Sequence, residues 1–322
     1  MKSNRFAALL LVLLVALATA APALAQPVEL VFTAWGGEAH WRMYDQLAAA
    51  FNEKYSDIKV SFIPTPDAYV DKMKTNIVAG TGPDVYFSQE MQTVGFINDG
   101  WFIPLDDYME KDPEFRIEQI PPGLFDSFQW EGKTGAIPVV TFVSMLFYNK
   151  QLLNEAGLAP PIGLSWEEFI EYAQTLTKRG PDGTATQYGH RIFYDVPNFY
   201  LYYMWAFGGD ILDVERRNSI LNTEGSLEGI EFIRDLIWAH EVVPKPGSEM
   251  ANFFLHRGNL GMMTHGSWEI GYLESQGILD FGVTTIPGGD RSITMAYPNA
   301  FGISTASKHP DEAWEFIKFA SG

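Results

Sequence analysis

Aromatic and short polar residues occur together at four points of the sequence, each beside an expected strand. Groups of this kind suit polyhydroxylated ligands, because the C–H face of a sugar ring stacks on an aromatic ring while its hydroxyls exchange hydrogen bonds with side chains. Each aromatic residue taken alone is equally compatible with a place in the core. The four groups are Trp35 with Glu38; Ser88, Gln89 and Glu90; Ser267 with Trp268; and Tyr297 with Asn299.

Residues that could carry other chemistry lack the spacing that this chemistry needs. Gly132-Lys133-Thr134 resembles the end of a phosphate-binding loop, but Ser127 occupies the position of the required first glycine, which favours a turn. The six histidines have no metal-ligand spacing, and His265 is interpreted as a strand-end residue. The acid pair Glu167-Glu168 lies at a helix start, and no pair can be assigned to glycoside hydrolysis. The sequence therefore indicates binding rather than catalysis, with no cofactor and no metal.

Composition limits the class of protein and its partners. The chain has 322 residues, of which 47% are hydrophobic, and this length favours two lobes over a single core. The formal net charge of −18 opposes binding to nucleic acid or an anionic membrane surface. The absence of cysteine excludes a disulfide framework, thiol catalysis and a lipid anchor on an N-terminal Cys.

The first 25 residues have the pattern of a secretory signal peptide. Lys2 and Arg5 give a positive start, an apolar run follows, and Ala23-Leu24-Ala25 supplies small residues for cleavage. The alternative, a membrane anchor, is disfavoured because the apolar run is short for a spanning helix. We therefore expect an acidic, exported, periplasmic protein.

Strands and helices alternate along the rest of the chain, which predicts an α/β fold whose sheets are mostly parallel. In such sheets ligands bind beyond the carboxyl ends of the strands, where the aromatic groups fall. Residues 165–168 predict a helix that begins with a capping box. The pattern predicts strands at 28–33, 58–62, 83–87, 135–148, 260–264, 281–286 and 301–304, and helices at 41–55, 69–78, 149–156, 165–178, 196–207, 226–240 and 310–319.

Over its whole length after the leader, the sequence resembles the extracellular solute-binding proteins of bacterial ATP-binding-cassette importers, in the sugar-binding group that includes the maltose-binding protein. The order and spacing of several blocks carry the resemblance. These blocks are AGTGPDVYFSQ (79–89), GKTGAIPVVTFVSMLFYNKQLLNEAGL (132–158), SWEEFIEYAQTLTK (165–178), FGGDIL (207–212), LGMMTHGSWEIGYL (260–273), FGVTTIP (281–287) and NAFGISTASKHPDEAWEFIKF (299–319).

The resemblance implies a two-lobe periplasmic-binding-protein-like fold of type II. Its first crossing between lobes would fall near Pro138–Phe142 and its second near Phe281–Pro287. Lobe one would then contain residues 26–139 and 287–322, and lobe two residues 140–286. Relatives continue past the last helix with further helices on lobe two, so the resemblance also implies a chain truncated at its C-terminus, with apolar surface left on that lobe.

The resemblance further implies a monomeric periplasmic receptor that holds a sugar or oligosaccharide between the lobes and delivers it to the permease subunits of the importer. Trp268 is the strongest candidate for stacking on a sugar ring. Some relatives carry a polar contact at the position of Phe142. The full set of candidate ligand-binding residues is Trp35, Glu38, Asp67, Tyr69, Ser88, Gln89, Glu90, Phe142, Asn198, Trp205, Ser267, Trp268, Tyr297 and Asn299.

Other ligands within the same fold remain open. A phosphate ligand such as glycerol phosphate would call for Arg or Lys at the junctions, and none is present there. A cationic solute such as a polyamine fits Glu38, Asp67 and Glu90 better. A secreted glycan hydrolase or lyase is a third alternative, but the sequence contains no acid pair that supports it.

Overall fold

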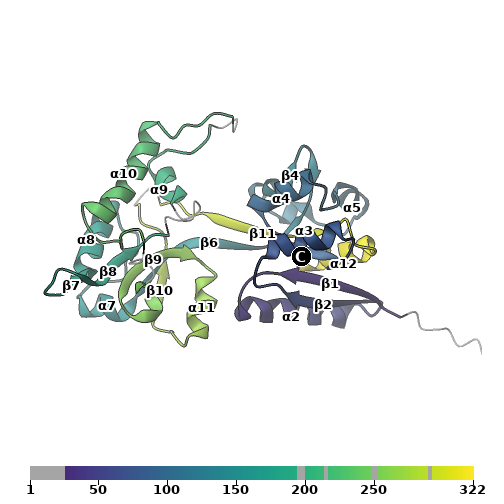
Figure 1. Cartoon of the computed structure of the whole chain (residues 1–322), viewed down its shortest axis with the longest axis horizontal. Helices are drawn as coiled ribbons and strands as arrows, with labels where there is room; N and C mark the ends of the chain where they lie inside the picture. Colours follow the sequence, from purple (N-terminus) through teal and green to yellow (C-terminus); the bar gives the residue numbers. More distant parts are fainter. Residues whose placement is uncertain (1–25, 194–199, 214–216, 248–251, 289–291) are drawn as a thin grey trace, which may run out of the picture.

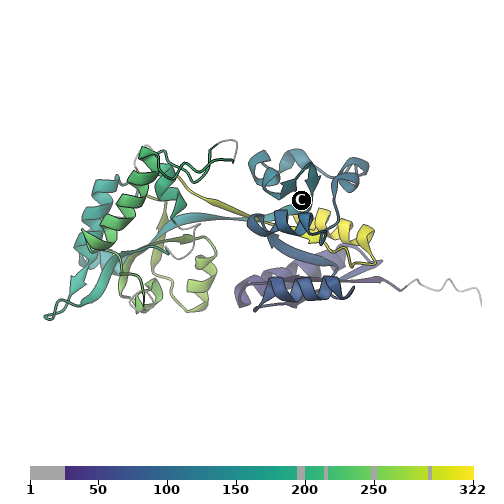
Figure 2. The ribbon, with the colours of Figure 1, turned by 45° about the horizontal axis from the view of Figure 1, so that its top comes forward.

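The structure, a computed structural model, describes residues 26–193, 200–213, 217–247, 252–288 and 292–322. The expected signal peptide lies outside these residues. The chain forms two lobes that lie side by side and are joined by two long strands, β6 and β11 (Figures 1 and 2).

Lobe one is built from both ends of the described chain. Its first three strands alternate with helices as the sequence predicts, and the last helix of the chain, α12, packs on the same core. Its elements are β1 (Val28–Ala34), α2 (Glu38–Lys54), β2 (Ile58–Pro64), α3 (Tyr69–Val78), β3 (Val85–Gln89), α4 (Glu90–Asn98), α5 (Asp106–Lys111), α6 (Pro122–Phe125), β4 (Gln129–Trp130), β5 (Lys133–Thr134) and α12 (Pro310–Ser321).

Lobe two contains the middle of the chain. Helix α8 begins with the predicted capping box: Ser165 Oγ accepts a hydrogen bond from the Glu168 amide (3.2 Å), and the Ser165 amide donates to the Glu168 carboxylate (2.8 Å). The elements that follow β6 (Ile137–Asn149) are α7 (Lys150–Glu155), α8 (Trp166–Leu176), β7 (Lys178–Arg179), β8 (Ala185–Arg191), α9 (Leu201–Ala206), α10 (Glu224–Trp238), β9 (Leu260–Gly266), α11 (Glu269–Ser275), β10 (Phe281–Thr284) and β11 (Ala296–Ile303).

One continuous sheet runs through both lobes in the order β2-β1-β3-β11-β6-β9-β8-β7, with β10 also paired to β6. Strands β1–β2, β1–β3 and β8–β9 pair in parallel, as the alternating pattern predicts. The two joining strands instead run antiparallel, because β6 leaves lobe one and β11 returns to it. The sheet is therefore mixed, with antiparallel pairs at the connection between the lobes and also between β7 and β8 at the far edge of lobe two.

The return connection differs from the crossing near Phe281–Pro287 that the resemblance implied. Strand β10, at the expected second crossing, pairs with the lobe-two end of β6, and the chain returns along β11. Strand β11 also begins before Phe301, so that Tyr297-Pro298-Asn299 lies within it. Pro298 pairs with Thr141 of β6, and the register of the two strands shifts just beyond it, between Asn299 and Ala300.

The core of lobe one is a cluster of aromatic rings drawn from distant parts of the chain. Phe32 on β1 lies 5.5 Å from Phe301 on β11 and 4.9 Å from Phe316 on α12, measured between ring centroids. Phe51 on α2 completes the cluster, 5.4 Å from Phe316. The burial of these rings explains why α12, which follows strands of both lobes in sequence, packs on lobe one.

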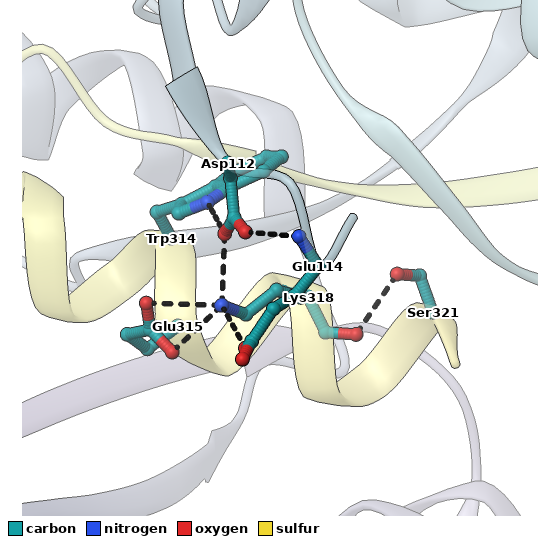
Figure 3. Close-up of polar contacts among 6 residues, drawn as sticks. All are labelled: Asp112, Glu114, Trp314, Glu315, Lys318 and Ser321. Atoms are coloured by element: carbon teal, nitrogen blue, oxygen red, sulfur yellow. Dashed lines mark hydrogen bonds and ion pairs between the residues drawn. The ribbon is translucent and has the colours of Figure 1, made fainter. Parts of the chain in front are cut away.

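A partly buried charge cluster fixes α12 to the segment after α5 (Figure 3). The Lys318 ammonium lies 2.8 Å from Asp112 and 3.1 Å from Glu315, and the Trp314 indole N–H donates to Asp112 at 2.9 Å. Burial alone would raise the pKa of Asp112, but the hydrogen bonds from Lys318 and Trp314 lower it to about 2. Burial would likewise lower the pKa of Lys318, yet its carboxylate partners raise it. Both groups are therefore charged at neutral pH.

Candidate ligand-binding cleft

A cavity of about 350 Å³ lies between the lobes beside the joining strands, and we call it the central cavity. Lobe one contributes residues from the end of β1 with the start of α2, and from the end of β3 with the start of α4. This position, beyond the carboxyl ends of parallel strands, is where open α/β sheets bind ligands. Its lining residues are Trp35, Gly36, His40, Tyr44, Phe87, Gln89, Met91, Phe142, Trp268, Tyr297 and Asn299.

Trp268 is the contribution of lobe two to the central cavity, and aromatic neighbours hold its ring edge-on. It lies 5.6 Å from Phe142 at 88° and 5.2 Å from Tyr297 at 71°. Gly266 makes room for the indole, since a Cβ at that position would lie 2.0 Å from the ring. The orientation of Trp268 is thus fixed by both joining strands and by the end of β9.

Trp35 is the matching ring of lobe one. It lies 4.7 Å from Phe87 and 4.9 Å from Tyr69, in both cases in an edge-to-face arrangement. The Tyr69 hydroxyl lies within hydrogen-bond distance of two backbone carbonyl oxygens, those of Thr33 (3.1 Å) and Phe87 (2.8 Å), and can donate to either. These contacts connect the ends of β1 and β3 and keep Trp35 at the cavity wall.

The polar groups of the central cavity are uncharged at neutral pH. Burial lowers the pKa of His40, so its imidazole is neutral. Burial, together with the nearby Glu90 carboxyl, raises the pKa of Tyr297 to about 12, against a hydrogen bond with Ser144 that lowers it. The described lining residues include no Asp, Glu, Lys or Arg. The cavity therefore offers amide, imidazole and phenol groups between aromatic walls.

Two further hollows adjoin the central cavity. The first, of about 380 Å³, shares Trp35 and Gln89 with it, and we call it the α3 hollow; its other lining residues are Ala68, Tyr69, Val70, Asp71 and Gln92. The second, of about 580 Å³, shares His40 and Trp268 with the cavity, and we call it the α11 hollow; its other lining residues are Gly37, Glu38, Ala39, Glu269, Tyr272, Ser275 and Gln276. The central cavity thus lies between the two hollows. Trp35 lines both the cavity and the α3 hollow, and Trp268 lines both the cavity and the α11 hollow.

The structure brings most of the candidate residues to the central cavity or to one of the two adjoining hollows. Trp35, Gln89, Phe142, Trp268, Tyr297 and Asn299 line the central cavity, while Tyr69 lines the α3 hollow and Glu38 the α11 hollow. The sequence did not single out Gly36, His40, Tyr44, Phe87 or Met91, which line the central cavity as well.

The other candidates lie elsewhere. Ser88 is fully buried and its hydroxyl is hydrogen-bonded to Thr93 at 2.6 Å, while the Ser267 hydroxyl accepts from the Val143 amide at 3.2 Å. Trp205 packs against the core of lobe two, and Asp67 is exposed outside the described hollows. Asn198 lies outside the described residues.

Glu90, at the first turn of α4, is half-buried. Burial raises the pKa of its carboxyl, and its Oε2 atom has no hydrogen-bond partner among the described residues. Glu90 directly follows Gln89, the last residue of β3, and Gln89 pairs with Asn299 of β11. Glu90 therefore lies near the joining strands without lining the central cavity.

The described residues contain no cluster of three or more His, Asp or Glu side chains placed to hold a metal ion. Among the helices formed by these same residues, none has the length and apolar character needed to cross a membrane.

Comparison with known proteins gives one family and several relatives. The family model described as "Bacterial extracellular solute-binding protein" matches residues 43–322. A Brucella abortus protein, named as a binding protein, is 27% identical over 290 residues, covering 86% of this chain and 67% of the relative. The maltotriose-binding protein of Pyrococcus abyssi is 24% identical over 285 residues, covering 86% of this chain and 59% of the relative.

A solved structure has the same fold. It is the substrate-binding protein Lmo0181 of Listeria monocytogenes in complex with cycloalternan, with a TM-score of 0.79 and 20% sequence identity. The match covers 92% of this chain and 76% of that one. The expected α/β fold of two lobes is therefore confirmed.

Proposed function

Because the chain belongs to the bacterial extracellular solute-binding protein family, we propose that it is the receptor of an ATP-binding-cassette importer that captures a sugar or oligosaccharide in the central cavity. A relative named for maltotriose and a structural neighbour solved in complex with cycloalternan support this ligand class. The receptor is expected to act in the periplasm, to deliver its ligand to the membrane permease as a monomer, and to leave the ligand chemically unchanged.

The observation that carries the proposal is the lining of the central cavity. Trp35 and Trp268 face it from different lobes, and its described polar groups carry no charge. Aromatic rings stack on the C–H faces of sugars, and amide, imidazole and phenol groups both donate to and accept from hydroxyls. A neutral polyhydroxylated ligand satisfies this lining without leaving a buried charge unpaired.

Capture follows from the positions of these residues on both lobes. A ligand in the central cavity touches Trp35 of lobe one, Trp268 of lobe two and Tyr297 of the joining strand β11. Contacts to both lobes stabilise the closed arrangement relative to an open one, and the joining strands take up the rotation. The closed protein is then the form that the permease recognises.

A cationic solute is the second candidate. The acidic side chains Glu38, Asp71 and Glu269 at the two flanking hollows favour it, because they would attract a polyamine. The uncharged central cavity speaks against it, since a cation there would lose hydration without an opposing charge.

Isothermal titration calorimetry with maltose, maltotriose, mannotriose, spermidine and glycerol 3-phosphate tests the proposal. We expect binding of at least one sugar, abolished or weakened at least about tenfold by Trp268→Ala. Trp238→Ala is the matched control, because Trp238 is 56% exposed at the end of α10 and lies outside the three spaces. Binding of spermidine but of no sugar would replace the proposal with its rival.

A further inference from the structure

Trp268 lies in a short turn between β9 and α11, and this turn is attached to the joining strand β6. Strand β9 ends at Gly266, where it is paired with β6, and α11 begins at Glu269. Between these points the Ser267 amide donates to the Val143 carbonyl at 2.8 Å, and the Ser267 hydroxyl accepts from the Val143 amide at 3.2 Å. The backbone of the turn is therefore fixed to β6 immediately before Trp268.

A second contact crosses the same turn through side chains. The Nδ1 atom of His265, on β9, lies 3.1 Å from Oε2 of Glu269, the first residue of α11. Both side chains are largely withdrawn from solvent, since that of His265 is 14% exposed and that of Glu269 is 10% exposed. Attraction between an imidazole and a carboxylate is screened less at such a place than at the surface. The pair therefore holds the start of α11 to the end of β9, on either side of Trp268.

Ring contacts connect this pair to the indole of Trp268. The His265 ring lies 5.3 Å from the Trp268 ring at 71°, in an edge-to-face arrangement. It also lies 4.5 Å from the ring of Phe193, over which the guanidinium of Arg191 lies at 4.2 Å. The imidazole is thus placed by Phe193 as well as by Glu269, and a shift of the imidazole would displace the indole.

We propose that His265 and Glu269 are positioning residues, whose contact sets the orientation of the Trp268 ring and thereby the affinity of the central cavity for its ligand. Neither side chain of the pair lines the central cavity, whereas Trp268 does, so the pair acts on a ligand there through the indole. The effect on affinity rests on the proposed function. The orientation of the ring does not, because it can be measured without a ligand.

Fluorescence of Trp268 in the ligand-free protein tests the first part of the proposal. The native chain and each variant are also made with Trp268→Phe, so that the difference between the two spectra is the emission of Trp268. We expect Glu269→Leu, which removes the carboxylate at similar size, to shift the Trp268 emission maximum and to increase its quenching by acrylamide. Glu269→Gln keeps an oxygen that can accept from Nδ1, and it should leave both quantities close to their native values.

A matched pair of polar replacements tests the imidazole. In His265→Asn the amide takes the place of Nδ1, beside Glu269, whereas in His265→Gln it takes the place of Nε2. Both variants lose the ring, so a shift of Trp268 emission in His265→Gln alone reports the lost contact. This pair decides the question if a thermal melt shows that Glu269→Leu does not fold. Glu274→Leu is the control, because Glu274 is exposed on α11 and lies outside the central cavity and both hollows.

Calorimetry with maltose, maltotriose and mannotriose tests the second part. Glu269→Leu and His265→Gln should lower the affinity for the tightest-binding of these sugars at least about fivefold, and Glu269→Gln and His265→Asn less than about twofold. Unchanged Trp268 emission in both disruptive variants, an equal shift in their conservative partners, or a shift without loss of affinity overturns the inference, while sugar binding by the native protein still supports the proposed function. If the native protein binds no sugar but the emission pattern is found, the proposed function fails and the positioning of the ring stands.

Discussion

The hydroxyls of Ser144 and Tyr297 lie 2.8 Å apart, in a buried hydrogen bond that joins the two strands between the lobes. Ser144 belongs to β6 and Tyr297 to β11, and Tyr297 also lines the central cavity and contacts Trp268. The wall of the cavity and the connection between the lobes therefore share a residue. Under the proposed function, a ligand that contacts Tyr297 would therefore act directly on these joining strands.

Removing either hydroxyl of this hydrogen bond should destabilise the protein, and the effects of removing the two should not be additive. Tyr297→Phe and Ser144→Ala each remove one hydroxyl from a buried site, and we expect each to cost about 1–3 kcal/mol in the free energy of unfolding. The double variant should cost less than the sum, with a coupling energy of about 1 kcal/mol, measured by urea denaturation. Additive costs would show that the two hydroxyls do not interact in solution.

Gly266→Ala should displace the Trp268 ring, because the new Cβ would lie 2.0 Å from an atom of the indole. We expect a loss of ligand affinity of at least about tenfold, close to that of Trp268→Ala, and a changed tryptophan emission spectrum. Gly95→Ala in α4 is the control, since a Cβ there meets nothing within 4 Å. Unchanged affinity in Gly266→Ala would mean that the ring position is unimportant.

The Asp112–Lys318 pair should make stability sensitive to acid. The pKa of Asp112 is about 2 in the folded protein, below its ordinary value of 3.8. The pair therefore contributes its full stabilisation above pH 4, and this contribution is lost as the pH falls from 4 to 2. We expect Asp112→Asn to reduce stability at pH 7 by about 2 kcal/mol and to flatten the decline between pH 4 and 2.

Lys318 adds an effect at the other end of the pH scale. Its pKa is raised in the folded protein, so its contribution is complete below its ordinary value of 10.5 and is lost as the pH rises beyond it. Asp107→Asn is the control for both effects, because Asp107 pairs with Lys111 at a site where its side chain is 80% exposed. An equal acid response in Asp107→Asn and Asp112→Asn would contradict the assignment.

Removing the ring of Phe316 should unfold lobe one more readily than removing a neighbouring ring of the same helix. Phe316 is fully buried against Phe32, Phe51 and Phe301, so Phe316→Ala should cost about 3–5 kcal/mol. Phe319→Ala, at a partly buried position, should cost less than half as much. Thermal and urea denaturation give both values, and equal costs would contradict the assigned core.

The order of helices and strands could be predicted because hydrophobic periodicity is local. The capping box at Ser165 and the proline at the start of α12 are signals of the same local kind. The start of β11 was missed because Pro298 suggests the end of a strand, whereas the strand continues through it, paired with Thr141 of β6. That pairing joins residues far apart in the sequence, so the local pattern around Pro298 does not reveal it.

The candidate site could be predicted in part for the same reason. Trp35, Gln89 and Trp268 follow strand ends, and that position places them at one edge of the sheet. His40 was missed because the sequence suggested a helix from residue 41, while α2 begins at Glu38 and places His40 in its first turn. An earlier helix start, indicated by the break at Gly36-Gly37, was the signal that could have revealed it.

Lobe one begins at the start of the described chain but needs the last strand and the last helix of the chain for its sheet and core. Strand β11 lies between β3 and β6, and Phe316 of α12 fills the core beside Phe32 of β1. A nascent polypeptide that has emerged only as far as β10 contains every lobe-two element that precedes β11, but its lobe one still has a gap in the sheet and an open core. Lobe one, whose first strands are synthesised before any of lobe two, is therefore completed only after these lobe-two elements have been made.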